Sequence, residues 1–439
     1  MKKMGRFVLI VLDSFGVGAM DDCVEVRPRD VGSNTAKHII QSKPDIKIPT
    51  LEKLGLMNAI GEEVGEHKFS DIANFGTANL THYGADSFLG HQEIMGTTPK
   101  VPLIQPFNEK IDEVERNLLR NGYKVRRVGE PGLQILVVNE VATVGDNLET
   151  DYGQVYNVSA CLDLISFEEL SKIGHVVRDV VQVSRVITFG GEQITLDNLL
   201  RARKVKNDKI AGVDAPESGV YNHGYQVVHL GYGIDKNVQI PTILDKKGIT
   251  VSFLGKIADI IQTTSTRLFP GVDSEYLFDC LMKEVKSIQN GFIALNIQET
   301  DLAGHAEDVE RYADRLEVSD KRIAELLPEL NVGDILIVMA DHGNDPTIGH
   351  SNHTRERVPL MIYSPGITGK YVGERDTMAD VAATVTVVVA ATLAQLGQCD
   401  GAVAGAALRH AECAPGVSIA GQGRSQGCQS AARGLCKCA

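Results

Sequence analysis

The sequence predicts an α/β fold built on a mostly parallel sheet that is flanked by helices. Short, continuous apolar runs bounded by turn residues, such as FVLIVL at 7–12 and GFIALNI at 291–297, are typical of buried strands. Helical periodicity lies between such runs, for example at 274–288 and 308–330. Strands that alternate with helices indicate parallel pairing, because a parallel connection needs a crossover long enough to hold a helix.

Taken in order, the chain starts with the strand at 7–12, which ends in Asp13. The middle of the chain differs in pattern: two segments that begin FNEKIDEV and SFEELSKI each predict a helix followed by a strand, which indicates an inserted α+β domain. The core then resumes with apolar runs at 291–297, 334–340 and 357–363. The predicted parts are a first core part at 1–98, the inserted domain at 99–220, a second core part at 221–385 and a tail at 386–439.

The tail differs in composition from the rest of the chain. It is rich in Ala, Gly, Cys and Gln with weak periodicity, which is typical of a loop or a low-complexity segment. The change is abrupt, and we hypothesise a frameshifted or recently acquired end. We assign the tail no function.

Charge and hydropathy exclude several classes of protein. The chain has 439 residues and a net charge of −13, and no Lys/Arg cluster stands out beyond 201–209, so nucleic-acid binding is not expected. The apolar segment at 381–396 is shorter than the roughly 18–20 residues of a membrane span and contains threonines. The N-terminal apolar run is too short for a secretory signal. We expect a cytoplasmic protein that does not bind membranes, and the sequence predicts no oligomeric state.

Carboxylates and imidazoles follow the carboxyl ends of the predicted strands, where open α/β sheets bind their ligands. A single Asp after a strand is usually a turn or cap residue, but three such patches in one chain favour a site. The six side chains are Asp13, Asp301, His305, Asp341, His342 and His353. Oxygen and nitrogen ligands without a thiolate suit Mn²⁺, Zn²⁺ or Mg²⁺. Six ligands can hold two ions, and two metals about 3.5–4 Å apart can clamp a phosphoryl group.

A site of this kind also needs a nucleophile, and the segment GADSFLGHQEIMG at 84–96 offers Ser87. A serine hydroxyl is a poor nucleophile at neutral pH unless a base or a metal activates it. Ser87 could instead be the N-cap of a following helix. Ser14, beside Asp13, is the rival nucleophile, although a turn residue is the simpler interpretation of it.

Several motifs together resemble the phosphopentomutases, the metal-dependent phosphomutase branch of the alkaline phosphatase superfamily. They are VLDSFGVGAMDD, DVGSNTAKHI, DSFLGHQEIMG, LGKIADI, TDLAGHAEDVERYA and DHGNDPTIGHSNHTRERVPLMIY, and the likeness spans about residues 5 to 385. The resemblance implies an alkaline-phosphatase-like α/β core with a cap domain inserted after the nucleophile motif.

The resemblance also implies roles for individual residues. Asp13, Asp341 and His342 match the ligands of one metal, and Asp301, His305 and His353 match those of the other. Ser87 stands where phosphopentomutases have a threonine that is phosphorylated and bridges both metals. Lys256 matches a lysine near the substrate phosphate, and Asn34 and His91 lie in matching motifs, so all three are candidate substrate contacts. The implied cofactors are two divalent ions, with Mn²⁺ favoured over Mg²⁺ or Zn²⁺.

The departures from the phosphopentomutases cluster on the substrate side. The segment RVITFGG at 185–191 lacks the family's phosphate-binding arginine at the equivalent place, and a second such arginine has no match near VYNHGYQVV. Cys161 replaces a ribose-contacting aspartate. His350 is either a substrate-facing or supporting residue or a plain loop residue. Candidate replacement contacts are Arg201, Arg203, His223 and His229.

These observations predict a sister branch of phosphopentomutase that moves a phosphoryl group within a sugar phosphate through a phosphoserine at position 87. Its partner would be a phosphorylated small molecule. Two alternatives stay open. One is a phosphate or sulfate ester hydrolase that uses the same dinuclear site. The other is a metal-binding homologue without catalytic activity.

Overall fold

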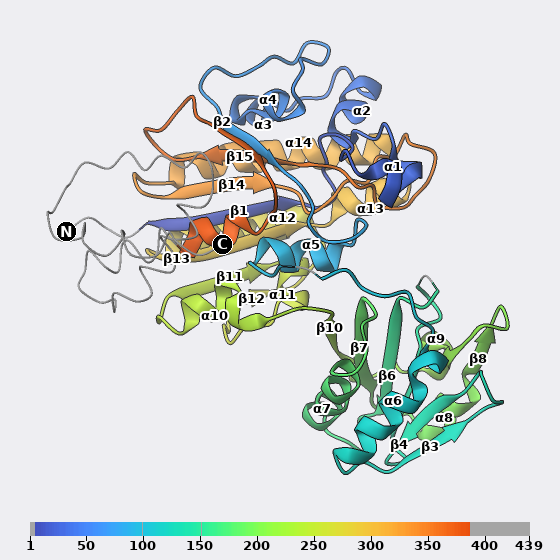
Figure 1. Ribbon diagram of the computed structural model, residues 1–439. Helices are drawn as coiled ribbons and strands as arrows, with labels where there is room; N and C mark the ends of the chain where they lie inside the picture. Colours follow the sequence, from blue (N-terminus) through green and yellow to red (C-terminus); the bar gives the residue numbers. More distant parts are fainter. Residues whose placement is uncertain (1–4, 99, 151, 387–439) are drawn as a thin grey trace, which may run out of the picture.

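The computed structural model describes residues 5–98, 100–150 and 152–386. Two sheets dominate it, one in the core and one in the inserted domain, which lies at one end of the core sheet (Figure 1). The tail predicted at 386–439 lies outside the described residues apart from its first residue.

The core sheet has eight strands in the order β12-β11-β13-β1-β14-β15-β2-β16. Its centre is parallel: Leu9 of β1 is in register with Ala294 of β13 on one side and with Ile337 of β14 on the other. The strands are β1 (Arg6–Leu12), β2 (Asn74–Ala78), β11 (Thr250–Leu254), β12 (Leu268–Phe269), β13 (Gly291–Ile297), β14 (Ile335–Met339), β15 (Val358–Tyr363) and β16 (Tyr371–Arg375). Only β15 runs antiparallel to both of its neighbours.

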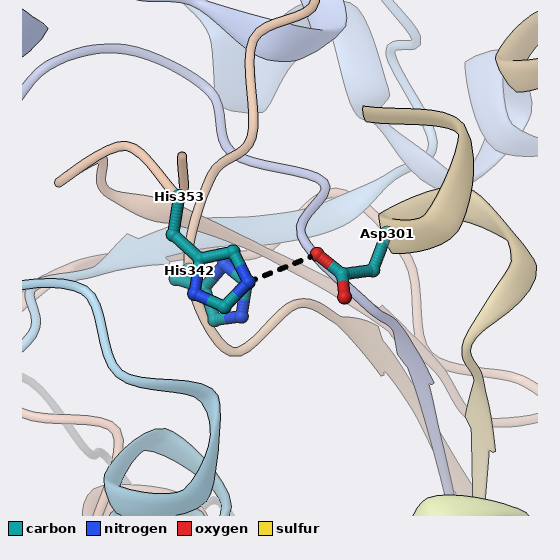
Figure 2. Close-up of side chains that lie close together, drawn as sticks. All are labelled: Asp301, His342 and His353. Atoms are coloured by element: carbon teal, nitrogen blue, oxygen red, sulfur yellow. Dashed lines mark ion pairs between the residues drawn. The ribbon is translucent and has the colours of Figure 1, made fainter. Parts of the chain in front are cut away.

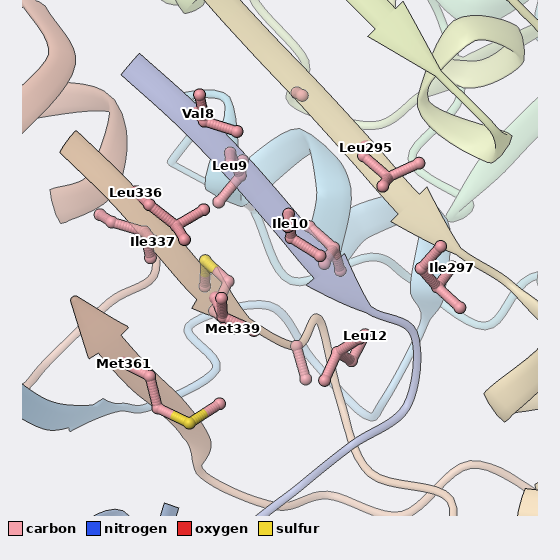
Figure 3. Packing of buried hydrophobic residues seen from close by; sticks show 14 of the residues in the cluster. Val8, Leu9, Ile10, Leu12, Leu295, Ile297, Leu336, Ile337, Met339 and Met361 are labelled. Atoms are coloured by element: carbon pink, nitrogen blue, oxygen red, sulfur yellow. The ribbon is translucent and has the colours of Figure 1, made fainter. Parts of the chain in front are cut away.

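The central strands are almost entirely apolar and lie in the interior of the core, with Arg6 of β1 and Asn296 of β13 as buried polar exceptions. Every residue of β1 and of β13 is buried. Figure 3 shows side chains of β1, β13 and β14 packing into one hydrophobic cluster. A strand buried on both faces needs no alternation of polar and apolar residues, which explains the continuous runs in the sequence.

The core helices begin where capping side chains accept hydrogen bonds from the first free backbone N–H groups. Asp273 caps α12 through the N–H of Tyr276 (2.7 Å), and Asp308 caps α14 through the N–H of Arg311 (3.0 Å). The core helices are α1 (Cys23–Val26), α2 (Thr35–Ser42), α3 (Pro49–Leu54), α4 (Leu56–Ile60), α5 (Ser87–Ile94), α10 (Ile240–Asp245), α11 (Lys256–Ile260), α12 (Ser274–Ser287), α13 (Glu299–His305) and α14 (Val309–Leu326), with 3-10 turns η1 (Pro28–Asp30), η2 (Lys236–Val238) and η3 (Leu327–Glu329).

The inserted domain is built on a six-stranded sheet in the order β10-β7-β6-β5-β4-β3. Two amphipathic helices pack against it, and their apolar sides form a separate hydrophobic cluster with the strands. Its elements are α6 (Phe107–Arg120), β3 (Val125–Val128), β4 (Ile135–Val138), β5 (Ala142–Asp146), β6 (Val155–Cys161), α7 (Phe167–Arg178), β7 (Arg185–Gly191) and β10 (Gln226–Gly231), with a smaller unit of α8 (Leu196–Arg201), β8 (Arg203–Lys206), β9 (Ile210–Val213) and α9 (Ala215–Ser218).

The predicted fold class is confirmed, since the core sheet is mostly parallel and both predicted helix–strand pairs of the inserted domain are present. The predicted boundary at 220/221 is wrong by one strand. Strand β10 pairs antiparallel with β7, with Val228 opposite Thr188, and so belongs to the second sheet. That pairing joins residues about forty positions apart, so the local sequence pattern does not predict which sheet β10 belongs to.

No helix within 5–98, 100–150 or 152–386 is long and apolar enough to cross a membrane.

A buried ion pair fastens the start of β1 to the turn before β14. The backbone N–H of Arg6 donates to Asp334 Oδ1 (2.6 Å), its Nε donates to Oδ2 (3.0 Å), and both side chains are about 5% exposed or less. We expect Asp334→Asn to lower the free energy of unfolding by about 3–5 kcal/mol, because it leaves a buried guanidinium without its counter-charge. Urea titration would measure this loss.

The matched control is Arg126→Gln, which removes an exposed ion pair with Glu140 in the inserted domain. Exposed pairs contribute about 0–1 kcal/mol, so this variant should unfold within that range of the unaltered protein. Equal effects from the two substitutions would contradict the assigned role of the Arg6–Asp334 pair.

Candidate metal centre

The predicted ligands converge because they leave neighbouring parallel strands at the same edge of the core sheet. Asp13 directly follows β1, and Asp341 and His342 follow β14. Asp301 lies in α13, the helix that follows β13 (Figure 1). Strands β13, β1 and β14 are adjacent, so their carboxyl ends bring these residues together.

One group of ligand atoms comes from Asp13, Asp341 and His342. Their donor atoms all lie within 4.8 Å of one another, and all three residues are buried. His342 Nε2 is 3.2 Å from Asp341 Oδ2 and 3.6 Å from Asp13 Oδ1. This is the set that the sequence predicted for one metal.

A second group comes from Asp301, His353 and again His342. Figure 2 shows the two imidazoles facing the Asp301 carboxylate, with an ion pair of 3.2 Å between His353 Nε2 and Asp301 Oδ1. The rings of His342 and His353 are stacked with their centroids 3.9 Å apart. His305, predicted in this set, also lies here: its Nε2 is 3.0 Å from His353 Nε2 and 3.4 Å from Asp301 Oδ2.

The residues present fit divalent metal ions. Asp13 Oδ1 and His342 Nε2 are fully buried and have no hydrogen-bond partner among the described residues, although buried polar atoms are normally paired. Both atoms face the first ligand group. The donors are carboxylate oxygens and imidazole nitrogens without a thiolate, which suits Mn²⁺, Mg²⁺ or Zn²⁺. His342 stands between the two groups and can serve either one.

The charges of the cluster are strongly coupled. Burial, reinforced by the neighbouring carboxylate of Asp341, raises the pKa of Asp13 to about 6. Burial lowers the pKa of His342, but the carboxylate of Asp341 outweighs it and brings that pKa to about 9. Burial raises the pKa of Asp301, yet hydrogen bonds from His305 and His353 hold it below its usual range. A site of crowded carboxylates that must share protons is one in which bound cations relieve repulsion.

Ser87 lies against the first ligand group as the first residue of helix α5. Its Oγ donates a hydrogen bond to Asp341 Oδ2 (2.7 Å) and accepts one from Lys256 Nζ (2.9 Å). The sequence left open whether Ser87 was itself the N-cap. The structure assigns the cap to Asp86, whose side chain accepts from the N–H of Leu89 (2.8 Å), so the Ser87 hydroxyl is free for the site.

Close packing places helix α5 at the metal centre. Gly90 is opposite Asp341, and a Cβ at position 90 would lie 2.8 Å from the Asp341 carbonyl oxygen. Only glycine allows this approach, and the approach is what brings Ser87 to the Asp341 carboxylate. His91, one residue later, contacts the same carboxylate (Nδ1 to Oδ2, 3.1 Å).

Ser14, the rival nucleophile, is directed elsewhere. Its Oγ lies 3.0 Å from the hydroxyl of Tyr312, and it is the backbone N–H that donates to Asp341 Oδ1 (3.1 Å). Its φ of 70° is in the left-handed region, an unfavourable conformation for a non-glycine residue that the turn after β1 imposes. Ser14 therefore orients Asp341 through its backbone, and of the two candidate hydroxyls it is that of Ser87 that contacts a ligand group.

The three predicted substrate contacts lie in different surroundings. Lys256 is at the reacting end, since its Nζ also donates to Asp13 Oδ2 (2.6 Å). His91 is fully buried and bonds Asn296 through Nε2 (2.7 Å), so it supports Asp341 and does not face a substrate. Asn34 caps helix α2 through the N–H of Lys37 (3.1 Å), and it does not line the cavity beside the metal centre.

A cavity of about 600 Å³ opens beside the metal centre between the core and the inserted domain. His305 and His353 line the cavity from the side of the metal centre. His350, which lies in the same loop as His353, also lines it. His350 Nε2 is 3.3 Å from Asp30 Oδ1, so it is tied to the wall of this cavity. The predicted replacement contacts Arg201, Arg203, His223 and His229 do not line it, which corrects that expectation.

Two residues that the sequence did not single out complete the site. Asn296 donates to Asp13 Oδ2 (2.9 Å), and it was detectable as the polar residue inside the apolar run at 291–297. Arg185, at the start of β7, pairs with Asp86 (3.2 Å) and lies over the ring of Phe88, joining the inserted domain to the nucleophile helix. Cys161 is fully buried in an apolar cluster, where burial raises the pKa of its thiol to about 11.

Comparison with known proteins agrees with this geometry. A family model described as "Metalloenzyme superfamily" matches residues 5–391. The phosphopentomutase of Caldanaerobacter subterraneus subsp. tengcongensis is 31% identical, over 87% of this chain and 93% of its own. Those of Clostridium kluyveri and Alkaliphilus oremlandii are 30% identical, each over 87% of this chain and 95% of their own length.

Because His342 belongs to both ligand groups, replacing it should affect both metal-binding positions, whereas replacing another ligand should affect only one. We expect His342→Ala to weaken binding at both positions, because its imidazole belongs to both groups. Asp13→Asn and His305→Ala should each weaken one position by about 10–100-fold and spare the other. Calorimetric titration of the metal-free protein with Mn²⁺ measures the two affinities. Two unchanged affinities in His342→Ala would contradict the shared position.

The close contact at Gly90 predicts that a single methyl group displaces the nucleophile. Gly90→Ala should reduce phosphoryl transfer by at least about 10²-fold, because a shift of about 1 Å in a reacting group has that effect. Mn²⁺ binding should be retained, since no ligand is altered. A steady-state assay and a Mn²⁺ titration of the same preparation check both statements, and full activity would contradict the steric argument.

Proposed function

We propose that this chain, which belongs to the metalloenzyme superfamily and is similar to phosphopentomutases along most of its length, is a phosphomutase that acts through Ser87. One observation carries the proposal: the Ser87 hydroxyl donates a hydrogen bond of 2.7 Å to Asp341, a carboxylate of the first ligand group. The substrate would be a phosphorylated small molecule of the sugar phosphate kind, with interconversion of ribose 1-phosphate and ribose 5-phosphate as the nearest precedent.

In the proposed cycle, phosphorylated Ser87 gives its phosphoryl group to the free hydroxyl of a monophosphate. The bond from Ser87 Oγ to phosphorus breaks, a bond from the substrate oxygen to phosphorus forms, and the proton of the substrate hydroxyl ends on Ser87. The resulting bisphosphate then reorients in the cavity. The bond from its other ester oxygen to phosphorus breaks, and that phosphoryl group is transferred to Ser87 Oγ. The cycle is balanced because each transfer regenerates the group that the next one needs.

Asp341 and Lys256 would control the serine oxygen. Asp341 Oδ2 accepts the hydroxyl hydrogen of Ser87, which aims the oxygen lone pairs away from the carboxylate. Burial lowers the pKa of Lys256, but the carboxylates of Asp13 and Asp341 outweigh it and keep the lysine protonated. Its ammonium group, 2.9 Å from Ser87 Oγ, is placed to stabilise negative charge that develops on that oxygen during transfer.

Asp13, Asp341 and His342 would hold one divalent ion and Asp301, His305 and His353 another, with Mn²⁺ as the proposed metal. Such ions supply charge neutralisation on the transferring phosphoryl oxygens. The inserted domain would limit water, because water that attacks phosphoserine turns a mutase into a phosphatase. Arg185 joins that domain to Asp86, next to the nucleophile, and so contributes to closing the site.

The test is intact mass spectrometry of the Mn²⁺-loaded protein after incubation with sugar bisphosphates. We expect one phosphoryl group on the unaltered protein and none on Ser87→Ala. When a sugar monophosphate is then added, the labelled protein should lose its phosphoryl group and the monophosphate should become a bisphosphate. Activity of Ser87→Ala should fall by at least about 10³-fold. Metal binding should not change.

Ser14→Ala is the matched control, because Ser14 Oγ contacts Tyr312 and not the ligand groups. This variant should still accept the phosphoryl group. Labelling that depended on Ser14 and not on Ser87 would refute the assigned nucleophile. Release of inorganic phosphate without any bisphosphate product would favour an ester hydrolase at the same site.

A further inference from the structure

The cavity beside the metal centre has a polarity that differs between its two walls. The wall from the inserted domain includes Leu103, Ile104, Gln154 and Ser184, none of which carries a charge. The core wall includes two arginines, Arg27 and Arg29, which flank Pro28 at the 3-10 turn η1. Among the described residues that line the cavity, these are the two with permanent positive charge.

The phosphopentomutases have phosphate-binding arginines in the inserted domain, and the sequence indicated that this chain lacks them at the equivalent places. The one arginine of β7, Arg185, is already bound to Asp86 and does not line the cavity. Recognition of a second anionic group therefore has to come from the core.

Arg27 is held in place beside the metal centre. Its Nε donates to Asp30 Oδ2 (2.7 Å) and its Nη2 donates to the backbone carbonyl of His353 (2.8 Å), which is a predicted metal ligand. Asp30 is itself fully buried and accepts from the N–H of Arg355 (2.8 Å), so the anchor is rigid. The remaining nitrogen, Nη1, makes no hydrogen bond with the described residues and can still donate one.

Arg29, unlike Arg27, is not held by other side chains of the described residues. Its side chain is exposed and makes no hydrogen bond or ion pair with the described residues. The two acidic residues that line the cavity are both compensated, Asp30 by Arg27 and Asp86 by Arg185. Among the acidic and guanidinium groups that line the cavity, the positive charge of Arg29 is therefore the one without a counter-charge in the described residues. A guanidinium can bind a carboxylate or a phosphate with two parallel hydrogen bonds.

We propose that Arg27 and Arg29 form the subsite for the second anionic group of the substrate, the group that is not being transferred. This inference rests on the proposed function, because it assumes that the first phosphoryl group lies at Ser87. Because Arg27 is bonded to the backbone carbonyl of His353, the subsite lies beside the second ligand group of the metal centre. The subsite thus selects a molecule with two anionic groups, the second being a phosphate or a carboxylate.

The experiment measures binding without catalysis. In the full-length Ser87→Ala protein loaded with Mn²⁺, calorimetry compares inorganic phosphate, ribose 1,5-bisphosphate and 3-phosphoglycerate. We expect at least one of the two ligands with two anionic groups to bind more tightly than inorganic phosphate. Arg29→Gln should weaken that ligand about tenfold, equivalent to about 1.4 kcal/mol, and leave the affinity for inorganic phosphate within twofold.

Controls separate a subsite from a structural role. Arg311→Gln removes another exposed core arginine, at the start of α14, whose side chain has no partner within the part of the chain that the structure describes, and this variant should bind every ligand as before. Arg27→Gln should weaken the same ligand as Arg29→Gln, and its Mn²⁺ affinity shows whether the contact with His353 was needed for the metal centre. Arg29→Lys should recover part of the lost affinity because it restores the charge.

Several results would overturn the inference. Unchanged binding in Arg29→Gln would do so, as would an equal loss for inorganic phosphate. A Ser87→Ala protein with both arginines intact that binds neither ligand more tightly than inorganic phosphate would also overturn it. The ligand whose affinity depends on Arg29 identifies the second group as a phosphate or a carboxylate. Binding is measured without Ser87, so these failures are distinct from a failure of Ser87 to accept a phosphoryl group.

Discussion

The buried carboxylate of Asp341 is the constraint on which the site depends. It receives the hydroxyl of Ser87, the backbone N–H of Ser14 and the imidazoles of His91 and His342. These four partners come from three segments, since Ser87 and His91 both lie in α5, so the carboxylate is satisfied only when β1, α5 and the loop after β14 are all in place. Parallel strands deliver those segments to one edge, and Gly90 allows the nucleophile helix to approach it.

The two halves of the molecule carry different parts of the function. In the proposed function the core supplies the reacting end, where the candidate ligands and Ser87 are held by buried contacts. The inserted domain supplies the cover, and Arg185 attaches it to Asp86 at the first turn of the nucleophile helix. The departures from phosphopentomutases fall in that cover, where Cys161 is buried among apolar residues. A change of substrate is possible there without disturbing the metal chemistry, because the two hydrophobic clusters are separate.

The sequence predicted the strands and helices that follow from local patterns, but it did not predict features that depend on contacts between residues far apart in the chain. The strands at 7–12 and 291–297 were recognisable because burial on both faces leaves an unbroken apolar run. Strand β10 was assigned to the core since its partner β7 lies far along the chain. The six candidate ligands lie near one another, but the double position of His342 depends on side-chain directions that spacing does not contain. His91 and Asn34 lay in the right motifs, yet one supports Asp341 and the other caps a helix.

The proposed function depends on two divalent ions bound at the edge formed by β13, β1 and β14. Anomalous diffraction at the manganese edge from crystals grown with Mn²⁺ tests this binding directly. We expect two peaks, one bounded by Asp13, Asp341 and His342 and the other by Asp301, His305 and His353. A single peak, or peaks away from these side chains, would contradict it.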